Sequence, residues 1–434
     1  MLIAKCLDTN ALGHLTIGGR DTVELAQNYG TPLYVMDEGE IRRACRSYHR
    51  SIEKFYDGKG LAAFASKAFC CKALCRIVKE EQMGLDVVSG GELYTAMAVD
   101  FPPDKIIFHG NNKTMEELTM ALEYGVGRIV VDNHTELITL NQLARAMGKK
   151  VGIMLRIKPG IDAHTHDFVR TGQIDSKFGF ALETGEAMEA VKAAIASKYL
   201  QLLGIHCHIG SQIFDIEPFE HAAEVMIAFL AQIRDETGVE LPELNLGGGF
   251  GIKYIPENDP VEYDRYMEKV SATVKRVCAQ KKLATPFILI EPGRSIVGSA
   301  GITLYRVGEV KEIPNIRTYV SVDGGMCDNP RYALYKSDYC FLVANKANQP
   351  KNQAVTVAGK CCETGDLLGE HVPLQQVNPG DVMAVLATGA YNYSMSSNYN
   401  RNPRPPVVMV GEDGSDRVII RRETMEDIVR NDLD

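Results

Sequence analysis

The segment RIVVDNHTELITLNQLARAMGKKVGIMLRI (128–157) contains a short apolar run, an amphipathic stretch and a second apolar run. In the middle part, HTELITLNQLARAMG (134–148), apolar residues recur every three or four positions, which is the spacing of a helix with one buried face. The flanking runs RIVVD (128–132) and VGIMLRI (151–157) are almost entirely apolar, as strands buried on both faces are. The segment therefore predicts a strand–helix–strand unit with parallel strands.

The same alternation extends in both directions, from about residue 60 to residue 292. A second amphipathic stretch is TMEELTMALEYG (114–125), and Gly125 and Gly148 stand where helix C-caps are expected. Eight strands predict a (β/α)₈ barrel; an open doubly wound sheet gives a similar pattern, but the strand count and the polar residues at the strand ends favour the barrel. The six further apolar runs are LAAFAS (61–66), GLDVVS (84–89), KIIFHG (105–110), LGIHCHI (203–209), ELNLGG (243–248) and FILIEPG (287–293).

After about residue 300 the periodicity changes to short strands separated by Gly, Pro and Asn turns. HLTIGG (14–19) and TPLYVMD (31–37), near the start of the chain, also have strand character. We therefore predict a barrel domain of residues 36–300 and a β-domain formed by residues 1–35 and 301–434. The later strand segments are GITLYRVGEVKEI (301–313), TYVSVDGG (318–325), QAVTVAGK (353–360), DVMAVLATG (381–389) and PVVMVGEDG (406–414).

The composition of the 434 residues is that of a globular protein, with 45% hydrophobic and 24% charged residues. The net charge of −9 argues against a nucleic-acid surface. Eleven cysteines without CxxC spacing predict reduced thiols. The start MLIAKCLDTN lacks an apolar signal segment and no run is long enough to span a membrane, so we expect a soluble cytoplasmic protein. His164 and His166 alone are weak evidence for a metal, and we expect none.

Active sites of barrels lie at the carboxyl ends of the strands. GGGFG (247–251), after the seventh strand, suits a phosphate group because glycine lets backbone N–H groups approach closely, although the same motif alone also describes a tight turn. Lys67 offers an amine for an aldehyde, and Glu291 offers a carboxylate for a pyridine nitrogen. Together they predict a pyridoxal-phosphate site. The other residues at strand ends are Asp86, Ser89, His109, Arg156, His208 and Arg294.

A series of motifs, in order along nearly the whole chain, resembles the barrel-type, alanine-racemase-like pyridoxal-phosphate decarboxylases, and most closely the diaminopimelate decarboxylase family. Two positions depart from the usual pattern, Phe69 in place of Asn and Thr364 in place of Ser. The motifs are FASKAF (64–69), GLDVVSGGEL (84–93), HGNNK (109–113), HTHDFVRTGQIDSKFG (164–179), GIHCHIGSQ (204–212), LGGGFGIKY (246–254), EPGRSIVG (291–298), VDGGMCDNPRYALY (322–335), AGKCCETGD (358–366) and TGAYNYSMSSNYN (388–400).

The resemblance implies pyridoxal 5'-phosphate as cofactor, bonded to Lys67. Glu291 would pair with the ring nitrogen, which favours decarboxylation over racemisation, and His208 would stack on the ring. His206 is interpreted as a structural strand residue. The remaining cofactor-binding residues would be Ser211, Gly248, Gly249, Gly293 and Arg294 around the phosphate, with Tyr391 closing over the cofactor.

The resemblance also implies the substrate meso-2,6-diaminopimelate, decarboxylated to L-lysine. Glu363 would bind its distal ammonium, and Cys362 would deliver a proton after carbon dioxide leaves. Both would come from the other subunit of a homodimer with shared active sites. The residues implied for the distal carboxylate are Arg294, Arg331 and Tyr335, with Tyr391 beside the substrate.

Two alternatives stay open at this point. A decarboxylase of ornithine, arginine or a D-amino acid would not need arginines for a second carboxylate. A non-catalytic protein that binds pyridoxal phosphate or a partner would be free to lose Lys67 and Cys362, yet both are present.

Overall fold

The computed structural model describes residues 2–161 and 176–433. It divides into two compact units. The barrel unit consists of Ala44–Gly251 and Pro260–Gly293, and the β unit consists of Met1–Arg43, Ile252–Asp259 and Arg294–Asp434. The domain bounds predicted from the sequence are 36–300 for the barrel and 1–35 with 301–434 for the β-domain, and they stay a prediction.

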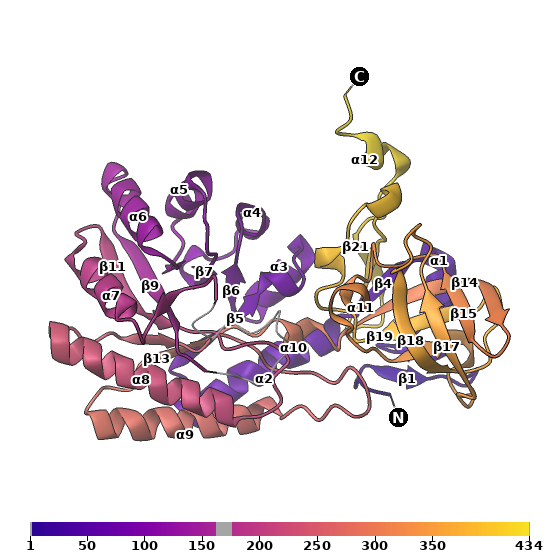
Figure 1. Cartoon of the computed structure of the whole chain (residues 1–434), viewed down its shortest axis with the longest axis horizontal. Helices are drawn as coiled ribbons and strands as arrows, with labels where there is room; N and C mark the ends of the chain where they lie inside the picture. Colours follow the sequence, from indigo (N-terminus) through magenta and orange to yellow (C-terminus); the bar gives the residue numbers. More distant parts are fainter. Residues whose placement is uncertain (1, 162–175, 434) are drawn as a thin grey trace. The chain divides into compact units, whose positions relative to one another are not determined.

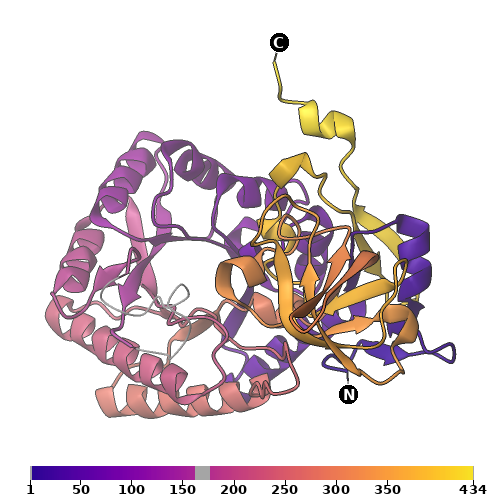
Figure 2. The same ribbon diagram turned by 45° about the vertical axis from the view of Figure 1, so that its right-hand side comes forward.

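In the barrel unit, eight parallel strands form a closed ring (Figures 1 and 2). They pair in the order β9-β11-β12-β13-β5-β6-β7-β8, and β8 pairs back to β9. The predicted barrel is confirmed and the open doubly wound sheet is excluded, because an open sheet would leave two unpaired edge strands. The strands are β5 (Gly60–Ala65), β6 (Gly84–Val87), β7 (Ile106–Phe108), β8 (Arg128–Val131), β9 (Val151–Lys158), β11 (Leu200–His206), β12 (Glu243–Asn245) and β13 (Phe287–Ile290); the short β10 (Phe180–Ala181) pairs with β9.

Helices surround this ring in Figure 2. Thr114 and Glu117 form a capping box that begins α5 (Met115–Tyr124), and Gly125 ends it in the left-handed region at φ 82°. Gly148 follows the C-cap Met147 of α6 (His134–Ala146) at a left-handed φ of 63° and ends this helix by donating its N–H to the carbonyl oxygen of Arg145. The remaining helices are α2 (Glu38–Tyr56), which contains the boundary between the units, α3 (Lys72–Glu80), α4 (Gly90–Met97), α7 (Glu186–Ala196), α8 (Glu217–Thr237) and α9 (Tyr263–Lys281).

The interior of the barrel has an apolar layer and a polar layer. Side chains of a strand alternate between its faces, so residues two apart point to the same side. Each apolar residue of the inner cluster is therefore followed, two positions later, by a residue that points toward the interior nearer the carboxyl end. The apolar layer comprises Ala63, Ile107, Val130, Met154 and Leu289, and the polar residues that follow four of them are His109, Asp132, Arg156 and Glu291.

The β unit contains a nine-stranded sheet and a three-stranded sheet. β4 (Leu33–Asp37), from the start of the chain, pairs antiparallel with β14 (Gly301–Ile313) and parallel with β20 (Val407–Val410), so the predicted contribution of the N-terminal segment is confirmed. The small sheet comprises β1 (Leu7–Thr9), β2 (Leu15–Ile17) and β3 (Arg20–Asp21). The large sheet also includes β15 (Arg317–Val322), β16 (Phe341–Val343), β17 (Gln353–Ala358), β18 (Leu367–Leu374), β19 (Val382–Leu386) and β21 (Asp416–Ile420).

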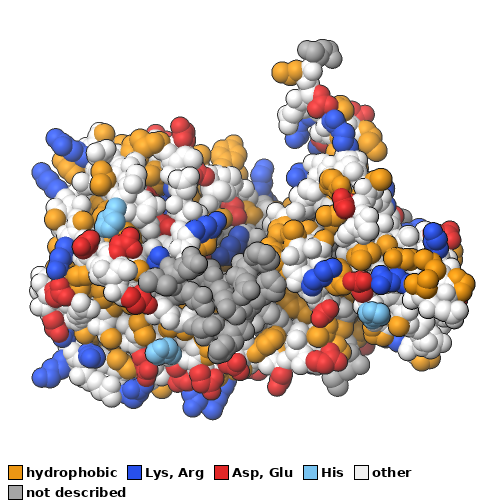
Figure 3. All heavy atoms as spheres, viewed as in Figure 1, with side chains coloured by type: hydrophobic (Ala, Val, Ile, Leu, Met, Phe, Trp, Pro, Cys, Tyr) orange, Lys and Arg blue, Asp and Glu red, His pale blue; other side chains and the backbone are white. Residues whose placement is uncertain are grey.

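The short helices of the β unit are α1 (Thr22–Tyr29), α10 (Arg294–Val297), α11 (Arg331–Tyr335) and α12 (Met425–Val429). Within the part of the chain that the structure describes, no helix combines the length and apolar character that a membrane span requires. Figure 3 shows acidic and basic side chains interspersed over the visible face. That face is unlike the continuous basic surface that contacts nucleic acid.

Candidate active site

Lys67 lies in a single 3-10 turn (Ser66–Ala68) that directly follows β5. Its side chain is exposed, whereas those of Ser66 and Ala68 are buried and anchor the turn. The buried Ser66 Oγ has no hydrogen-bond partner among the described residues. The lysine therefore stands at the carboxyl end of the barrel, where a ligand can reach its amine.

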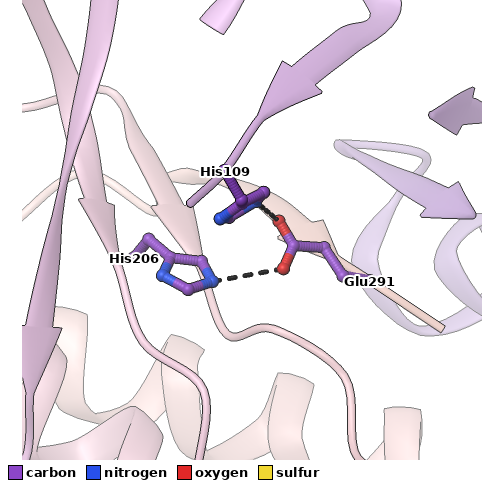
Figure 4. A group of neighbouring side chains, drawn as sticks. All are labelled: His109, His206 and Glu291. Carbon is purple, nitrogen blue, oxygen red and sulfur yellow. Dashed lines mark hydrogen bonds and ion pairs between the residues drawn. The ribbon is translucent and has the colours of Figure 1, made fainter. Parts of the chain in front are cut away.

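Glu291 follows β13 and is the centre of a buried hydrogen-bond cluster (Figure 4). Its Oε1 lies 2.6 Å from His109 Nε2 and accepts a hydrogen bond of 2.6 Å from Asn245 Nδ2. Its Oε2 lies 3.1 Å from His206 Nε2. Four strand ends, those of β7, β11, β12 and β13, thus converge on one carboxylate.

The electrostatics of this cluster keep Glu291 ionised. Burial alone would raise the pKa of its carboxyl group, but His109 and His206 together outweigh burial and hold the pKa well below its ordinary value. Burial lowers the pKa of His206 to about 4 against the opposing effect of Glu291, so its ring is neutral at neutral pH. Because an ionised carboxylate only accepts hydrogen bonds, His206 must donate through Nε2.

The same two histidines and Glu291 form a group of described residues whose ligand atoms are close enough to hold a metal ion. The separations of 2.6 and 3.1 Å between imidazole nitrogen and carboxylate oxygen are those of hydrogen bonds. As they stand, these side chains bond to one another.

The glycine loop Gly247–Gly249 follows β12 and approaches neighbouring backbone more closely than a side chain would permit. A Cβ on Gly248 would lie 2.1 Å from the carbonyl oxygen of Glu291, and one on Gly249, at φ 118°, would lie 2.6 Å from that of Gly210. Phe250 anchors the loop by stacking on Phe219 with ring centroids 5.5 Å apart. The result is a backbone cradle of the kind that binds phosphate groups.

His208 lies beside this loop, and its Nδ1 accepts a hydrogen bond of 3.3 Å from the backbone N–H of Gly248. Burial, reinforced by the positive charge of Lys67, lowers its pKa well below the ordinary value, so the ring is neutral. Ser211 is half-buried after β11, and a Cβ on Gly293 would lie 3.0 Å from that of Ala65. The predicted ring-stacking histidine and the phosphate loop are therefore neighbours.

The barrel unit fits pyridoxal phosphate on three counts. An exposed lysine follows β5, an ionised buried carboxylate follows β13, and a glycine cradle follows β12. In addition, Asp86 Oδ1 and His206 Nδ1 are buried without a hydrogen-bond partner in the described ranges. Burial raises the pKa of Asp86 to about 6, against the opposing effect of His109, whose Nε2 lies 3.9 Å away.

The β unit contains a second cluster, of arginines and tyrosines. Arg294 and Arg331 both face the ring of Tyr391, at 4.9 and 5.5 Å from its centroid, and Arg331 lies 5.0 Å from the ring of Tyr335. Arg294 also donates to the hydroxyl of Tyr254. Tyr391 adopts a left-handed φ of 60°, which is uncommon for a residue with a side chain. The sequence-predicted carboxylate-binding residues are thus brought together.

Arg331 is buried, 9% exposed, and its contacts among the described residues are with the rings of Tyr335 and Tyr391 rather than with a carboxylate. Its Nε has no hydrogen-bond partner among the described residues. A guanidinium is always charged, and a buried charge is costly unless an anion accompanies it. The cluster therefore fits an anionic ligand.

Cys362 and Glu363 lie in the loop between β17 and β18, and both side chains are exposed. The backbone N–H of Cys362 donates to Asn400 Oδ1 at 2.7 Å, and Glu363 Oε2 accepts a hydrogen bond of 3.2 Å from the hydroxyl of Tyr399. The motif HTHDFVRTGQIDSKFG (164–179), including His164 and His166, lies outside the described residues as far as residue 175.

Sequence reasoning missed Asn245 and gave His206 only a structural place in its strand. His206 does belong to β11, but it also bonds to the carboxylate of Glu291. The signal for Asn245 was its position two residues before Gly247, on the face that turns inward at the end of a buried strand.

The comparisons with known proteins agree with this geometry. The family described as "Pyridoxal-dependent decarboxylase, pyridoxal binding domain" matches residues 38–298. The diaminopimelate decarboxylase of Bacillus subtilis (strain 168) is 50% identical over 98% of this chain and 96% of its own length. That of Staphylococcus aureus (strain COL) is 44% identical over 98% of both chains.

Among solved structures, the diaminopimelate decarboxylase of M. jannaschii in complex with L-lysine has a TM-score of 0.90 at 36% identity, covering 100% of this chain and 99% of its own. The Helicobacter pylori enzyme with L-lysine has a TM-score of 0.85 at 31% identity, covering 94% and 98% of the two chains. Since the likeness extends over the whole length in both sequence and structure, the chain belongs to the diaminopimelate decarboxylase family of the pyridoxal-dependent decarboxylases.

Proposed function

We propose that this protein decarboxylates meso-2,6-diaminopimelate to L-lysine and carbon dioxide, using pyridoxal 5'-phosphate. Membership of the family supports the reaction class and the cofactor. Arg331 supports diaminopimelate as the substrate, because a buried guanidinium without an anionic partner in the described part of the chain is suited to a carboxylate. Diaminopimelate has a second carboxylate to place there, whereas ornithine and lysine have none.

In the barrel unit, each proposed role follows from chemistry at a stated atom. Lys67 bonds the aldehyde of the cofactor, and the glycine loop with Ser211 and Gly293 receives its phosphate. Glu291, ionised and held by three donors, keeps a proton on the ring nitrogen. Pyridoxal phosphate, when bound, supplies the electron sink for the bond that breaks. His208, neutral beside the loop, packs against the ring.

In the β unit, Arg294, Arg331, Tyr335 and Tyr391 form the proposed site for the distal carboxylate. Arginine suits this role because its planar fork bonds both oxygens of a carboxylate. Glu363 binds the distal ammonium, and Cys362 delivers the proton that replaces the lost carboxyl group. Both are exposed, as residues that complete a site on another molecule would be.

We further propose a homodimer in which the loop with Cys362 and Glu363 completes the partner's site. Eleven free cysteines are consistent with a reducing compartment and hence with the cytoplasm. Two variants test the assembly: Lys67→Ala and Cys362→Ala should each be nearly inactive, but their mixture should regain up to about a quarter of wild-type activity, since each mixed dimer restores one of two sites. A mixture that stays inactive although mixed dimers form would refute the shared site.

The decisive experiment incubates the purified protein and pyridoxal phosphate with meso-diaminopimelate and, separately, with ornithine, and measures carbon dioxide and amine products. We expect L-lysine from diaminopimelate and little product from ornithine. Arg331→Ala should weaken diaminopimelate binding by about tenfold or more, because a charge-assisted pair is lost. Equal turnover of ornithine would instead support the decarboxylase of another basic amino acid, and no turnover at all would support a non-catalytic protein.

A further inference from the structure

The side chain of Asn245 connects two parts of the cofactor site within the barrel unit. Its Nδ2 donates to Glu291 Oε1 at 2.6 Å, and its Oδ1 accepts from the backbone N–H of Gly247 at 2.8 Å. A backbone N–H only donates and an ionised carboxylate only accepts, so the amide has one possible orientation. Asn245 is fully buried at the end of β12.

The two oxygens of Glu291 are occupied unequally. Each carboxylate oxygen offers about two acceptor positions. Oε1 uses both, toward His109 and Asn245 at 2.6 Å each, whereas Oε2 has only His206 among the described residues, at the longer distance of 3.1 Å. A further donor therefore finds its acceptor at Oε2.

We propose that Asn245 is a positioning residue that fills Oε1 of Glu291, together with His109, and so fixes Oε2 as the atom that meets the ring nitrogen of pyridoxal phosphate. This inference rests on the proposed function. It adds that the glycine cradle and the ring-nitrogen carboxylate are held in register by one amide, which joins Gly247 to Glu291.

The substitution Asn245→Asp tests the proposal because it keeps the shape and reverses one hydrogen bond. The new carboxyl group could still accept from Gly247, but its second oxygen would face Glu291 Oε1 at hydrogen-bond distance. Two carboxylates this close share a proton, and one of their pKa values rises strongly. Below that raised pKa the proton restores the bond, whereas above it the charges repel and Glu291 loses its fixed orientation.

The titratable and charged groups that face the side chains of residue 245 and Glu291 come from every neighbouring strand end and from the turn after β5. They also titrate in the wild type, as does the cofactor itself. The measured quantity is therefore the ratio of the cofactor dissociation constants of variant and wild type at each pH, in which these common titrations cancel. The facing groups are Lys67, Asp86, His109, Arg156, His206 and His208.

The cofactor-depleted full-length protein is titrated with pyridoxal phosphate from about pH 5.5 to pH 8.5. For Asn245→Asp the ratio should be near one at the acidic end and rise to about tenfold or more at the alkaline end. For Asn245→Ala, which removes the donor at every pH, the ratio should be raised by a similar factor throughout. Asn133→Asp is the matched control: Asn133 caps α6 in the same unit, and the change there should leave the ratio at one.

A pH-independent ratio for a folded Asn245→Asp protein would overturn the proposal, since a purely structural role predicts no rescue at low pH. If that variant does not fold, Asn245→Ala decides the matter: unchanged cofactor affinity there refutes the positioning role. The proposed function fails differently. Wild-type protein that binds no pyridoxal phosphate, or binds it without decarboxylating diaminopimelate, contradicts the function before any variant is compared.

Discussion

The two ends of the barrel use buried polar residues in opposite ways. At the amino end, Arg128 at the start of β8 and Glu243 at the start of β12 form a two-point ion pair, with N–O distances of 2.7 and 2.6 Å. Arg128 Nη1 donates in addition to the carbonyl oxygen of Asp104 at 3.1 Å. All three nitrogen atoms of this guanidinium thus donate hydrogen bonds within the barrel unit.

At the carboxyl end, by contrast, several buried polar atoms have no hydrogen-bond partner within the described chain. They are Ser66 Oγ, Asp86 Oδ1, Asp132 Oδ1 and His206 Nδ1. A buried polar group without a partner costs free energy, so their accumulation at one end is unfavourable for the empty fold. The difference indicates that the amino end contributes stability and that the carboxyl end is arranged for a ligand.

The largest expected effect comes from breaking the amino end. Arg128→Ala leaves Glu243 as a buried charge without its partner, and should lower the free energy of unfolding by about 3 kcal/mol. Denaturant unfolding measures this, with Arg145→Ala, an exposed arginine of α6, as a control that should change little. If the Arg128→Ala protein kept its stability but lost decarboxylase activity, the inference that the amino end of the barrel contributes stability would be contradicted.

At the carboxyl end, Glu291→Gln should reduce kcat on the order of a hundredfold, because it removes the charge that we propose holds a proton on the ring nitrogen. Stability should change little. His206 can move its proton to the unpartnered Nδ1, so its Nε2 can accept from the new amide. Steady-state kinetics and denaturant unfolding of the same preparation measure the two effects. A strong loss of stability with intact kcat would show that Glu291 serves the fold instead.

The barrel was predictable from the sequence because its signal is repeated. Eight apolar runs separated by helical stretches leave few topologies, and closure follows from the count. The prediction of the strands in the β unit was less complete. β18 (Leu367–Leu374) was missed because His371, at a left-handed φ of 53°, and Pro373 interrupt its strand pattern. β16 and β21 are too short or too exposed to give a periodic signal.

The sequence points to residues whose type matches a task, as for Lys67, Glu291 and the glycine loop; the structure places them at carboxyl ends of barrel strands, and their roles stay predictions. Asn245 was not predictable in this way, because an asparagine at a strand end is ordinary until its partner is known. Its partner, Glu291, lies 46 residues away in sequence and meets it only when the barrel closes. The roles assigned to Cys362 and Glu363 stay predictions, because they depend on a second subunit.

The smallest expected effect concerns Asp86, and it distinguishes the two ends most directly. Burial, opposed mainly by His109, raises the pKa of this carboxyl group to about 6, from 3.8. A carboxyl group whose pKa is higher in the folded state destabilises the fold when ionised. The cost is therefore present above pH 6 and disappears as the pH falls toward 4. Asp86→Asn should remove part of this cost, since a buried amide is also costly, and stabilise the cofactor-depleted protein by about 1–2 kcal/mol at pH 8.

As the pH falls toward 4 the carboxyl group becomes protonated in the unfolded chain as well, so the difference in unfolding between the variant and the wild type should shrink and be small at about pH 4. Asp104→Asn, an exposed position in the same unit, should show no such pH-dependent difference. If Asp86→Asn is instead less stable than the wild type at pH 8, attraction to Lys67 and His109 exceeds the cost of burial. The carboxyl end would then resemble the amino end, with an ionic network that stabilises the fold, and the contrast between the two ends would fail at this residue.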